Sequence, residues 1–302
     1  MIRRQPERFS LVVATYGRST ALGPLVASLM AQTWRDFDVI VVDQNADDRV
    51  APIIAPLRDA GLLGGHLRMR RPSASGARNL GLAEARGEIV AFPDDDCWYE
   101  PDTLAKAAAH FDGDRGLAGV AGRWVEAGRM PGDDKAEIDN EAMRHFRAGN
   151  LACITLFLRR ERVVGVGGFD ERIGPGKWFA GAEETDLVMS LLAAGGRLRR
   201  AGDVLVHHPP DDGARSGPKR HPLQTIRARA RGTGALYAKH RLPAWVIGRG
   251  LLGPIAAVPE AGIAISAARM LGRIEGLVGW HLGDLKGHVV HPAGGVRNGG
   301  QP

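Results

Sequence analysis

The sequence predicts an α/β fold, in which helices flank a central sheet. Over the first two hundred residues, short apolar runs alternate with segments of helical periodicity. Four of the apolar runs end in polar clusters, as expected where ligands bind beyond the carboxyl ends of strands. With 302 residues, 44% hydrophobic and 25% charged, the chain can form one large domain or a domain with a smaller companion.

Each predicted element rests on a local pattern. Apolar runs bounded by polar or turn residues predict strands at 9–14, 37–42, 66–70, 89–92, 117–124, 151–158 and 204–206. Apolar positions three or four apart predict helices at 20–32, 50–60, 75–85, 101–111 and 183–194. Ser19 or Thr20 is expected to cap the first helix.

Two intervening segments carry weaker patterns. Residues 129–150 are polar and irregular, and predict a surface excursion. Residues 163–169 are rich in glycine, but they are too short and wrongly placed for a dinucleotide-binding fingerprint.

Three consecutive carboxylates, Asp94, Asp95 and Asp96, follow the predicted strand at 89–92 and a proline. Adjacent negative charges repel, so such crowding favours a bound cation. Side chains two apart in an extended segment share a face, so Asp94 and Asp96 can point at one ion. Mg²⁺ and Mn²⁺ suit a site of one or two carboxylates completed by water and phosphate oxygens. An acidic turn or a helix N-terminus is the alternative interpretation.

Polar clusters follow four of the predicted strands. They are Thr15-Tyr16-Gly17-Arg18, Asp43-Gln44-Asn45, Asp94-Asp95-Asp96 and His207-His208. Together they predict a single crevice that holds a nucleotide and a metal ion.

Composition also bears on location. The two cysteines, Cys97 and Cys153, lack metal-ligand spacing and form no disulfide framework, which favours a reducing cytoplasm. The net charge of +6 is uneven, because residues 197–249 hold twelve Lys and Arg against three Asp, a net charge of +9. A basic segment of this kind suits anionic lipid, phosphorylated substrates or nucleic acid.

The composition of the sequence changes near residue 210. This change divides a predicted domain at 1–210 from a mainly helical extension at 211–302. Residues 209–222 are expected to be a linker, residues 225–239 are basic, and residues 242–271 are apolar but broken by prolines. No uninterrupted apolar run reaches the roughly 18–20 residues that cross a bilayer. These helices are therefore expected either to pack on the domain or to lie at a membrane surface, and the chain after His288 is expected to be disordered.

The order of motifs resembles that of family 2 glycosyltransferases with the GT-A fold. The motifs are Val-Val-Ala-Thr-Tyr-Gly-Arg, Val-Ile-Val-Val-Asp-Gln-Asn, Ala-Arg-Asn-Leu-Gly-Leu-Ala-Glu-Ala-Arg-Gly, Phe-Pro-Asp-Asp-Asp, Gly-Gly-Phe-Asp-Glu and Ala-Glu-Glu-Thr-Asp-Leu. The resemblance spans residues 9–210, about two thirds of the chain, and does not specify a sugar.

The resemblance implies a donor site for a nucleoside-diphosphate sugar. The residues it assigns to the nucleotide are Thr15, Tyr16, Arg18, Asp43, Arg78, Asn79, Asp94 and Asp95. The triplet corresponds to the Asp-X-Asp motif, so Asp96 is the expected direct ligand of Mg²⁺ or Mn²⁺, with Asp94 and His207 as further ligands and His208 as the second choice for the histidine. Exposure at a strand end is the alternative interpretation of the two histidines.

The resemblance also implies an acceptor side. The family usually has Glu-Asp where this chain has Glu183-Glu184, so Glu184 corresponds to the catalytic base and Glu183 is the alternative. Stabilisation of a helix N-terminus is the other interpretation of these acidic residues. Trp178, Phe179 and Asp186 are expected to bind the acceptor, although core packing would equally explain the two aromatic residues.

The sequence thus predicts an inverting, metal-dependent glycosyltransferase that acts on a glycan or lipid-linked acceptor in cell-surface polysaccharide or glycolipid assembly. It is expected in the cytoplasm, at the anionic inner face of the cell membrane. Alternatives are an inactive module that binds sugar nucleotides and a sugar nucleotidyltransferase, although the latter lacks its glycine-rich basic loop. No nucleic-acid partner is expected, because the arginines at 227, 229 and 231 have no aromatic platform or recognition motif nearby.

Overall fold

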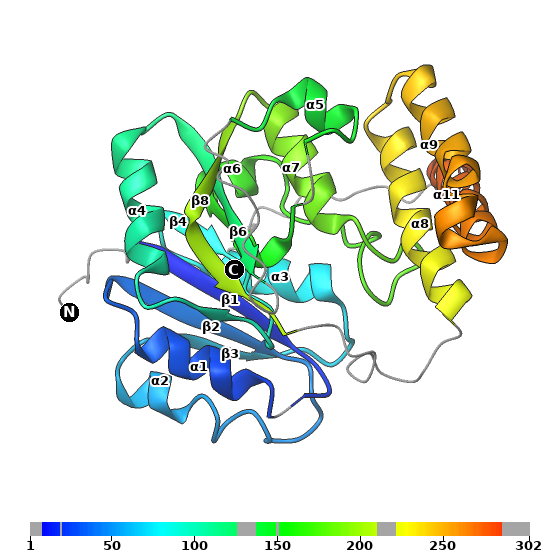
Figure 1. Cartoon of the computed structure of the whole chain (residues 1–302). Helices are drawn as coiled ribbons and strands as arrows, with labels where there is room; N and C mark the ends of the chain where they lie inside the picture. The colour runs from blue at the N-terminus through cyan, green and yellow to red at the C-terminus, as the bar shows by residue number, and fades with distance from the viewer. Residues whose placement is uncertain (1–7, 19, 126–136, 149–150, 210–221, 286–302) are drawn as a thin grey trace, which may run out of the picture.

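A computed structural model describes residues 8–18, 20–125, 137–148, 151–209 and 222–285. Helices cover both faces of a twisted sheet, and a stack of helices from the C-terminal part of the chain lies beside it (Figure 1). The predicted α/β fold with a helical extension is therefore confirmed. The boundary expected at residue 210, the linker and the end of the chain after residue 288 lie outside the described residues, as do Ser19 and parts of the expected surface excursion.

The sheet is mixed and has eight strands in the order β3-β2-β1-β4-β7-β6-β8-β5. The strands are β1 (Phe9–Thr15), β2 (Phe37–Asp43), β3 (Leu63–Arg68), β4 (Ile89–Ala91), β5 (Trp98–Tyr99), β6 (Leu117–Val125), β7 (Leu156–Arg159) and β8 (Arg197–His207). Strands β3, β2, β1 and β4 pair in parallel, whereas β7 runs antiparallel to both β4 and β6. Because β8 pairs in parallel with β6, the ends of β1, β2, β4 and β8 all reach one edge of the sheet.

Successive side chains of a strand point to opposite faces of the sheet, and each face has its own hydrophobic core. Leu11 and Val13 of β1 belong to the core under α1, α2 and α4, whereas Val12 belongs to the core under α3 and α7. Strand β2 alternates in the same way, with Val41 on the first side and Val42 on the second. The period of two in a strand therefore buries both faces of the sheet.

The helices differ in places from those that the sequence predicts. They are α1 (Leu22–Met30), α2 (Ala55–Asp59), α3 (Ala74–Glu84), α4 (Thr103–Gly113), α5 (Asn140–Arg144), α6 (Arg160–Gly165), α7 (Glu183–Ala193), α8 (Pro222–Lys239), α9 (Ala244–Ala256), α10 (Val258–Ala261) and α11 (Ile263–Leu285). Helix α2 begins late because Pro56, which has no N–H group, suits only its first turn. Thr20 does not cap α1, whose N-cap is Ala21.

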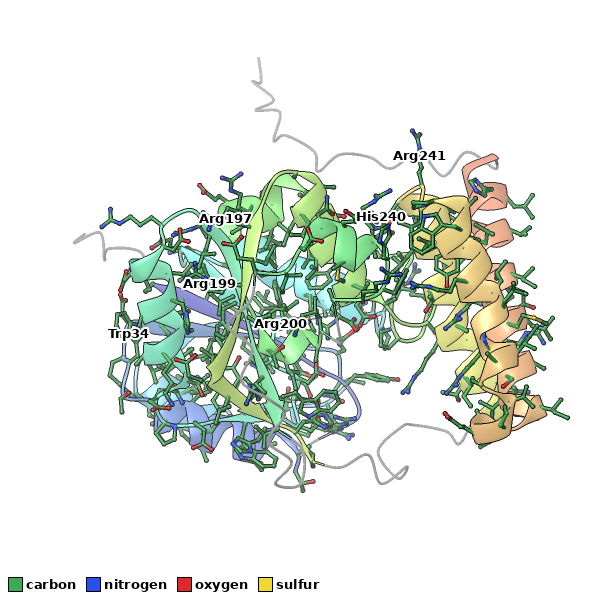
Figure 2. The ribbon with its side chains drawn as sticks, turned by 45° about the horizontal axis from the view of Figure 1, so that its top comes forward. Trp34, Arg197, Arg199, Arg200, His240 and Arg241 are labelled. Atoms are coloured by element: carbon green, nitrogen blue, oxygen red, sulfur yellow. The ribbon has the colours of Figure 1, made fainter. Side chains whose placement is uncertain are left out.

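Strand β8 is much longer than the predicted strand at 204–206. Its first half contains three arginines, and these charged residues hid the strand pattern. Arg197 and Arg199 both bond Asp114, while Arg200 on the opposite side of the strand bonds the Ala148 carbonyl (Figure 2). Strand β5 is only two residues long and was not predicted.

The C-terminal extension packs on the sheet domain through α8 and one side of α11. Ala235 and Leu236 of α8 and Trp280 of α11 belong to the same core cluster as α7. Glycines bring α8 and α11 together, since a Cβ atom at Gly272 or Gly276 would lie 2.3 or 2.0 Å from a backbone oxygen of α8. Packing on the domain, one of the two expected arrangements, thus holds for α8 and this side of α11.

The other side of the stack exposes large apolar residues on α9 and α11. They include Leu252, Ile255, Ile263, Leu271, Val278 and Leu282, of which Ile263 is 76% exposed. Among the described residues, no helix has both the length and the apolar character that a membrane span requires.

We expect replacement of Gly276 by alanine to destabilise the protein by about 1–3 kcal/mol, because the added methyl group overpacks the contact between α8 and α11. Urea unfolding of the full chain measures the effect. Gly283→Ala is the matched control on the same helix: a Cβ atom there meets nothing within 4 Å, so the better helix former should be neutral or slightly stabilising. Equal stability of Gly276→Ala and wild type would contradict the packing of these two helices.

Candidate active site

A cavity of about 600 Å³ opens where β4, β8 and the first turn of α7 meet. Its polar lining consists of Arg78, Asp94, Glu183, Glu184, Thr185, His208 and Arg229. Its remaining walls are largely apolar and include Trp124, Met143, Phe146, Leu151 and Ile154. Residues from both predicted halves of the site, the acidic triplet and the Glu-Glu pair, therefore face one space.

Each carboxylate of the triplet has a cationic partner. Asp94 Oδ1 accepts a hydrogen bond from Arg78 Nη2 at 3.0 Å, and Asp95 Oδ1 accepts one from Arg18 Nη1 at 2.9 Å. The same Arg18 nitrogen also donates to Asp96 Oδ2. The arginines thus offset the repulsion that three adjacent charges would create.

The carboxylates of Asp95 and Asp96 differ in how readily they ionise. Burial raises the pKa of Asp95 above its ordinary value, although Thr15 Oγ1 donates to Asp95 Oδ2 at 2.7 Å. Burial would also raise the pKa of Asp96, but the hydrogen bond from His208 and the charge of Arg18 together lower it. Asp96 is therefore the more readily ionised of these two carboxylates.

His208, rather than His207, lies beside the acidic triplet. His208 Nε2 is 3.2 Å from Asp96 Oδ1, whereas His207 Nε2 is 2.5 Å from Glu100 Oε1 and its ring stacks on Trp98. Adjacent residues at the end of a strand point to opposite sides, so only one of the pair can face the cavity. His208, the second choice in the sequence, therefore lies nearer to Asp96 than His207 does, and the identity of the histidine ligand stays a prediction.

Arg78 joins the two halves of the site. It is 6% exposed, and its Nη1 donates to Glu183 Oε1 at 3.1 Å while Nη2 bonds Asp94. Its guanidinium group also lies over the ring of Phe169, 5.4 Å from the centroid. A buried charge is stable only when it is paired, so Arg78 fixes Asp94 and Glu183 relative to each other.

The first turn of α7 presents Glu184 to the cavity. Its N-cap, Ala182, has a φ of 74°, a left-handed conformation that is costly for a residue with a Cβ atom. Burial raises the pKa of Glu184 to about 7, and the charge of Glu183 adds to this shift. With Glu183 held by Arg78, Glu184 has the position and the ionisation of a general base near neutral pH.

The other donor-side residues lie in different settings. Tyr16 is 59% exposed in the loop after β1. Asp43 at the end of β2 is fully buried, and His66, Arg68 and Asn45 occupy its carboxylate oxygens. Its carboxylate therefore organises this loop, and its expected contact with a nucleotide base stays a prediction.

The side chain of Asn79 is engaged by the protein backbone, and its expected role at the nucleotide stays a prediction. Its side-chain amide donates to the Phe169 carbonyl at 2.8 Å, and its Oδ1 accepts from the Phe169 N–H at 2.9 Å. Neighbouring residues in a helix point about 100° apart, so Asn79 faces away when Arg78 faces the cavity. Asn79 thus anchors the loop that supports Arg78.

The three residues expected at the acceptor lie outside the cavity lining. Trp178 is 58% exposed and stacks with Arg231 at 3.8 Å, while Phe179 is buried against Trp280. Core packing, the alternative interpretation, therefore accounts for Phe179.

Asp186 is 1% exposed and pairs with Lys239 Nζ at 2.7 Å and His240 Nε2 at 2.8 Å. Figure 2 shows His240 at the end of α8, where it meets α7. The structure assigns Asp186 to the contact between these two helices, because both of its oxygens are occupied there.

Sequence patterns did not single out three residues that line the cavity. Trp124, which is 40% exposed, contacts His208 edge to face, and Phe146 adds a second aromatic side chain. The position of Trp124 at the end of a predicted strand was an available signal. Arg229 was noted only as part of a basic segment, and no local pattern reveals that α8 folds back to the cavity.

The donor atoms beside Asp96 fit a small divalent cation. Among the described residues, no group of three or more His, Cys, Asp and Glu side chains is arranged to enclose a metal ion. Mg²⁺ and Mn²⁺ need only one or two protein ligands when phosphate and water complete their shells. Asp96 and His208, 3.2 Å apart, offer one oxygen and one nitrogen of that kind.

Residues 10–159 match the family model "Glycosyl transferase family 2". Among similar proteins, the poly(ribitol-phosphate) β-N-acetylglucosaminyltransferase TarS of Staphylococcus aureus is 32% identical over 39% of this chain and 22% of its own length. The UDP-Glc:α-D-GlcNAc-diphosphoundecaprenol β-1,3-glucosyltransferase WfaP of Escherichia coli is 23% identical over 53% of this chain and 64% of its own length. The amylovoran biosynthesis glycosyltransferase AmsB of Erwinia amylovora is 33% identical over 30% of this chain and 32% of its own length.

Two solved structures share the fold over most of the chain. TarS residues 1–349 from S. aureus, in complex with UDP-GlcNAc, superpose with a TM-score of 0.62 and 17% identity over 91% of this chain and 92% of that one. The mannosyltransferase PcManGT of Pyrobaculum calidifontis, in complex with GDP-Man and Mn²⁺, gives a TM-score of 0.59 and 17% identity over 93% and 88%. At this identity, the likeness concerns the fold alone.

Proposed function

Because residues 10–159 form a family 2 glycosyltransferase domain within a GT-A fold, we propose that this protein transfers a sugar, with inversion, from a nucleoside-diphosphate donor to an acceptor hydroxyl. The observation that carries the proposal is the single cavity lined by both Asp94 of the triplet and Glu184 of α7. Inverting transfer needs a donor and a base on opposite sides of one reacting carbon. Arg78 bonds both Asp94 and Glu183, the neighbour of Glu184, and this link between the triplet and α7 supports the proposal.

The residues of the chain divide the reaction between them. Glu184 takes the proton of the acceptor hydroxyl as its oxygen bonds to the anomeric carbon. The bond from that carbon to the nucleoside diphosphate breaks at the same time, and the diphosphate leaves with the bonding electrons. Arg18, beside the triplet, supplies positive charge to the departing group. Trp124 offers the sugar an aromatic face at the cavity wall.

The proposal includes a divalent cation, Mg²⁺ or Mn²⁺, held by Asp96 and His208. Such a cation would supply positive charge that offsets the charge of the leaving diphosphate. Asp94, whose Oδ1 is engaged by Arg78, then acts on the donor side without being the principal ligand.

The acceptor that we propose is a glycan or a lipid-linked glycan precursor in cell-surface polysaccharide or glycolipid assembly. The similar proteins bear names that refer to poly(ribitol-phosphate), to a sugar on diphosphoundecaprenol and to amylovoran. We extend this acceptor class, and not any one of these molecules, to the present chain.

We also propose that the apolar side of α9 and α11 rests on the cytoplasmic face of an anionic membrane. Large apolar side chains are exposed together there, and residues 197–249 carry a net charge of +9. Apolar contact combined with basic residues is what binds a helix to an anionic lipid surface.

We expect Glu184→Gln to lower kcat by about 10²–10⁴-fold while leaving donor binding intact, because it removes only the base. Steady-state turnover and calorimetric binding of the donor, screened among UDP-, GDP- and dTDP-sugars, measure the two effects. Glu183→Gln is the matched comparison and should lose less turnover. If Glu183→Gln has the larger effect, the two roles are exchanged. Donor binding with no wild-type turnover for any acceptor tested would favour the inactive binding module.

The pH dependence follows from the raised pKa of Glu184, about 7. The base acts when it is deprotonated, so kcat should fall about tenfold per pH unit below that value and level off above it. The expected profile is measured between pH 5 and about 9, with donor binding followed in parallel. If kcat reports the chemical step and does not change with pH over this range, the assignment of Glu184 as the base is contradicted.

We expect His208→Ala to weaken Mn²⁺-dependent binding of the nucleoside diphosphate by at least about tenfold, whereas His207→Ala should leave it unchanged. Calorimetry with and without EDTA, using UDP, GDP and dTDP, distinguishes the two variants. The opposite order would restore His207 as the ligand. Binding that EDTA does not affect would remove the cation from the proposal.

We expect the full chain to float with vesicles that contain phosphatidylglycerol, and the double variant Leu252→Asp, Ile263→Asp to float less, because charges on the apolar side oppose its contact with lipid. Val164→Asp is the matched control, since Val164 is also exposed, at 51%, but lies on α6. Equal recovery of all three proteins with vesicles would exclude the membrane contact.

A further inference from the structure

Three arginines on α8 differ in what they meet. Arg227 and Arg231 lie one turn apart and both bond Glu275 of α11. Arg229 lies about 200° around the helix from Arg227, and it lines the active-site cavity instead. Glu275 thus pairs with both arginines on the α11 side, while Arg229 remains at the cavity.

The backbone holds Arg229 in place. The Ala180 N–H donates to the Ala228 carbonyl at 3.2 Å, which joins α8 to the loop before α7. A Cβ atom at Gly232 would lie 1.9 Å from the Gly181 carbonyl oxygen, so the helix and the loop are in close contact there. Arg229 therefore has a defined position relative to the first turn of α7, which carries Glu184.

The charges of the cavity leave Arg229 without a counterion. Arg78 is balanced by Asp94 and Glu183, and His208 is paired with Asp96. No described side chain forms an ion pair or a hydrogen bond with Arg229, and this side chain is exposed. An unpaired guanidinium beside a reacting centre is suited to a bidentate contact with a phosphate group.

We propose that Arg229 binds a phosphate or phosphodiester group of the acceptor, next to the hydroxyl that Glu184 deprotonates. This inference rests on the proposed function, which it deepens by stating the acceptor's chemistry. The phosphate can belong to a lipid-linked saccharide or to a polyol-phosphate chain. The apolar wall formed by Met143, Leu151 and Ile154 would take an alkyl chain in the first case.

Direct binding to the full-length protein tests the proposal without any donor. Octyl phosphate and ribitol 5-phosphate are titrated calorimetrically in EDTA, which removes metal-dependent binding at the donor side. Arg229→Gln should weaken the binding of at least one phosphate probe by about tenfold or more, because it removes a charge-assisted contact. Binding of neutral octyl glucoside should not change. Tighter binding of octyl phosphate indicates a lipid-linked acceptor, and equal or tighter binding of ribitol 5-phosphate indicates a polyol phosphate.

Two control variants separate this site from general charge effects. Arg58→Gln removes an exposed arginine from α2, and it should bind both probes as wild type does. Arg18→Gln changes the donor side, and it should not affect the probes either. Equal losses in Arg58→Gln and Arg229→Gln, a loss confined to Arg18→Gln, or no binding of either probe to wild type would overturn the proposal.

The proposed function and this inference can fail separately. Thermal melting and binding of the donor by Arg229→Gln should match those of wild type, because Arg229 forms no hydrogen bond or ion pair with the triplet or Arg78. Loss of donor binding in this variant would assign Arg229 to the donor and overturn the inference. Phosphate binding that depends on Arg229, in a protein that turns over no sugar nucleotide, would instead leave this site standing and remove the glycosyl transfer.

Discussion

The buried guanidinium of Arg78 is the contact on which the arrangement of the site depends. A charge that is 6% exposed must be paired, and Arg78 meets this need with one carboxylate from the strand side and one from α7. Those two carboxylates belong to segments about ninety residues apart in the chain. One side chain therefore links the acidic triplet to the first turn of α7, and Asn79 and the loop at Phe169 keep this side chain in place.

The C-terminal helices are part of this site and not an independent attachment. Buried Asp186 on α7 pairs with Lys239 and His240 at the end of α8, and the glycines of α11 let that helix approach α8 closely. Arg229 reaches the cavity as a result. One side of the helical stack brings Arg229 to the cavity, and the other is apolar and exposed, so the acceptor site and the membrane contact that we propose would involve the same few helices.

Crowded carboxylates at the active site are handled in two ways. In the acidic triplet, Arg18 and Arg78 supply compensating charge, and His208 raises the fraction of Asp96 that is ionised. At Glu184, burial and the charge of Glu183 are not offset in this way, and together they raise the pKa of Glu184 towards neutrality. A buried carboxylate without a compensating charge destabilises the fold, but its raised pKa lets it take up a proton near neutral pH.

Sequence by itself determined the α/β class and the edge of the sheet where the polar clusters gather, because apolar alternation and strand ends are local properties. The order of its motifs indicated the family. Tertiary structure alone decided which neighbour of a pair faces the cavity: Arg78 and not Asn79, His208 and not His207. It also buried Asp43 and Asp186 among partners distant in the chain, and it brought Trp124 and Arg229 to the site. The reason is physical, since the direction of a side chain depends on helix rotation, strand register and the charges that meet it, and distant segments supply those charges.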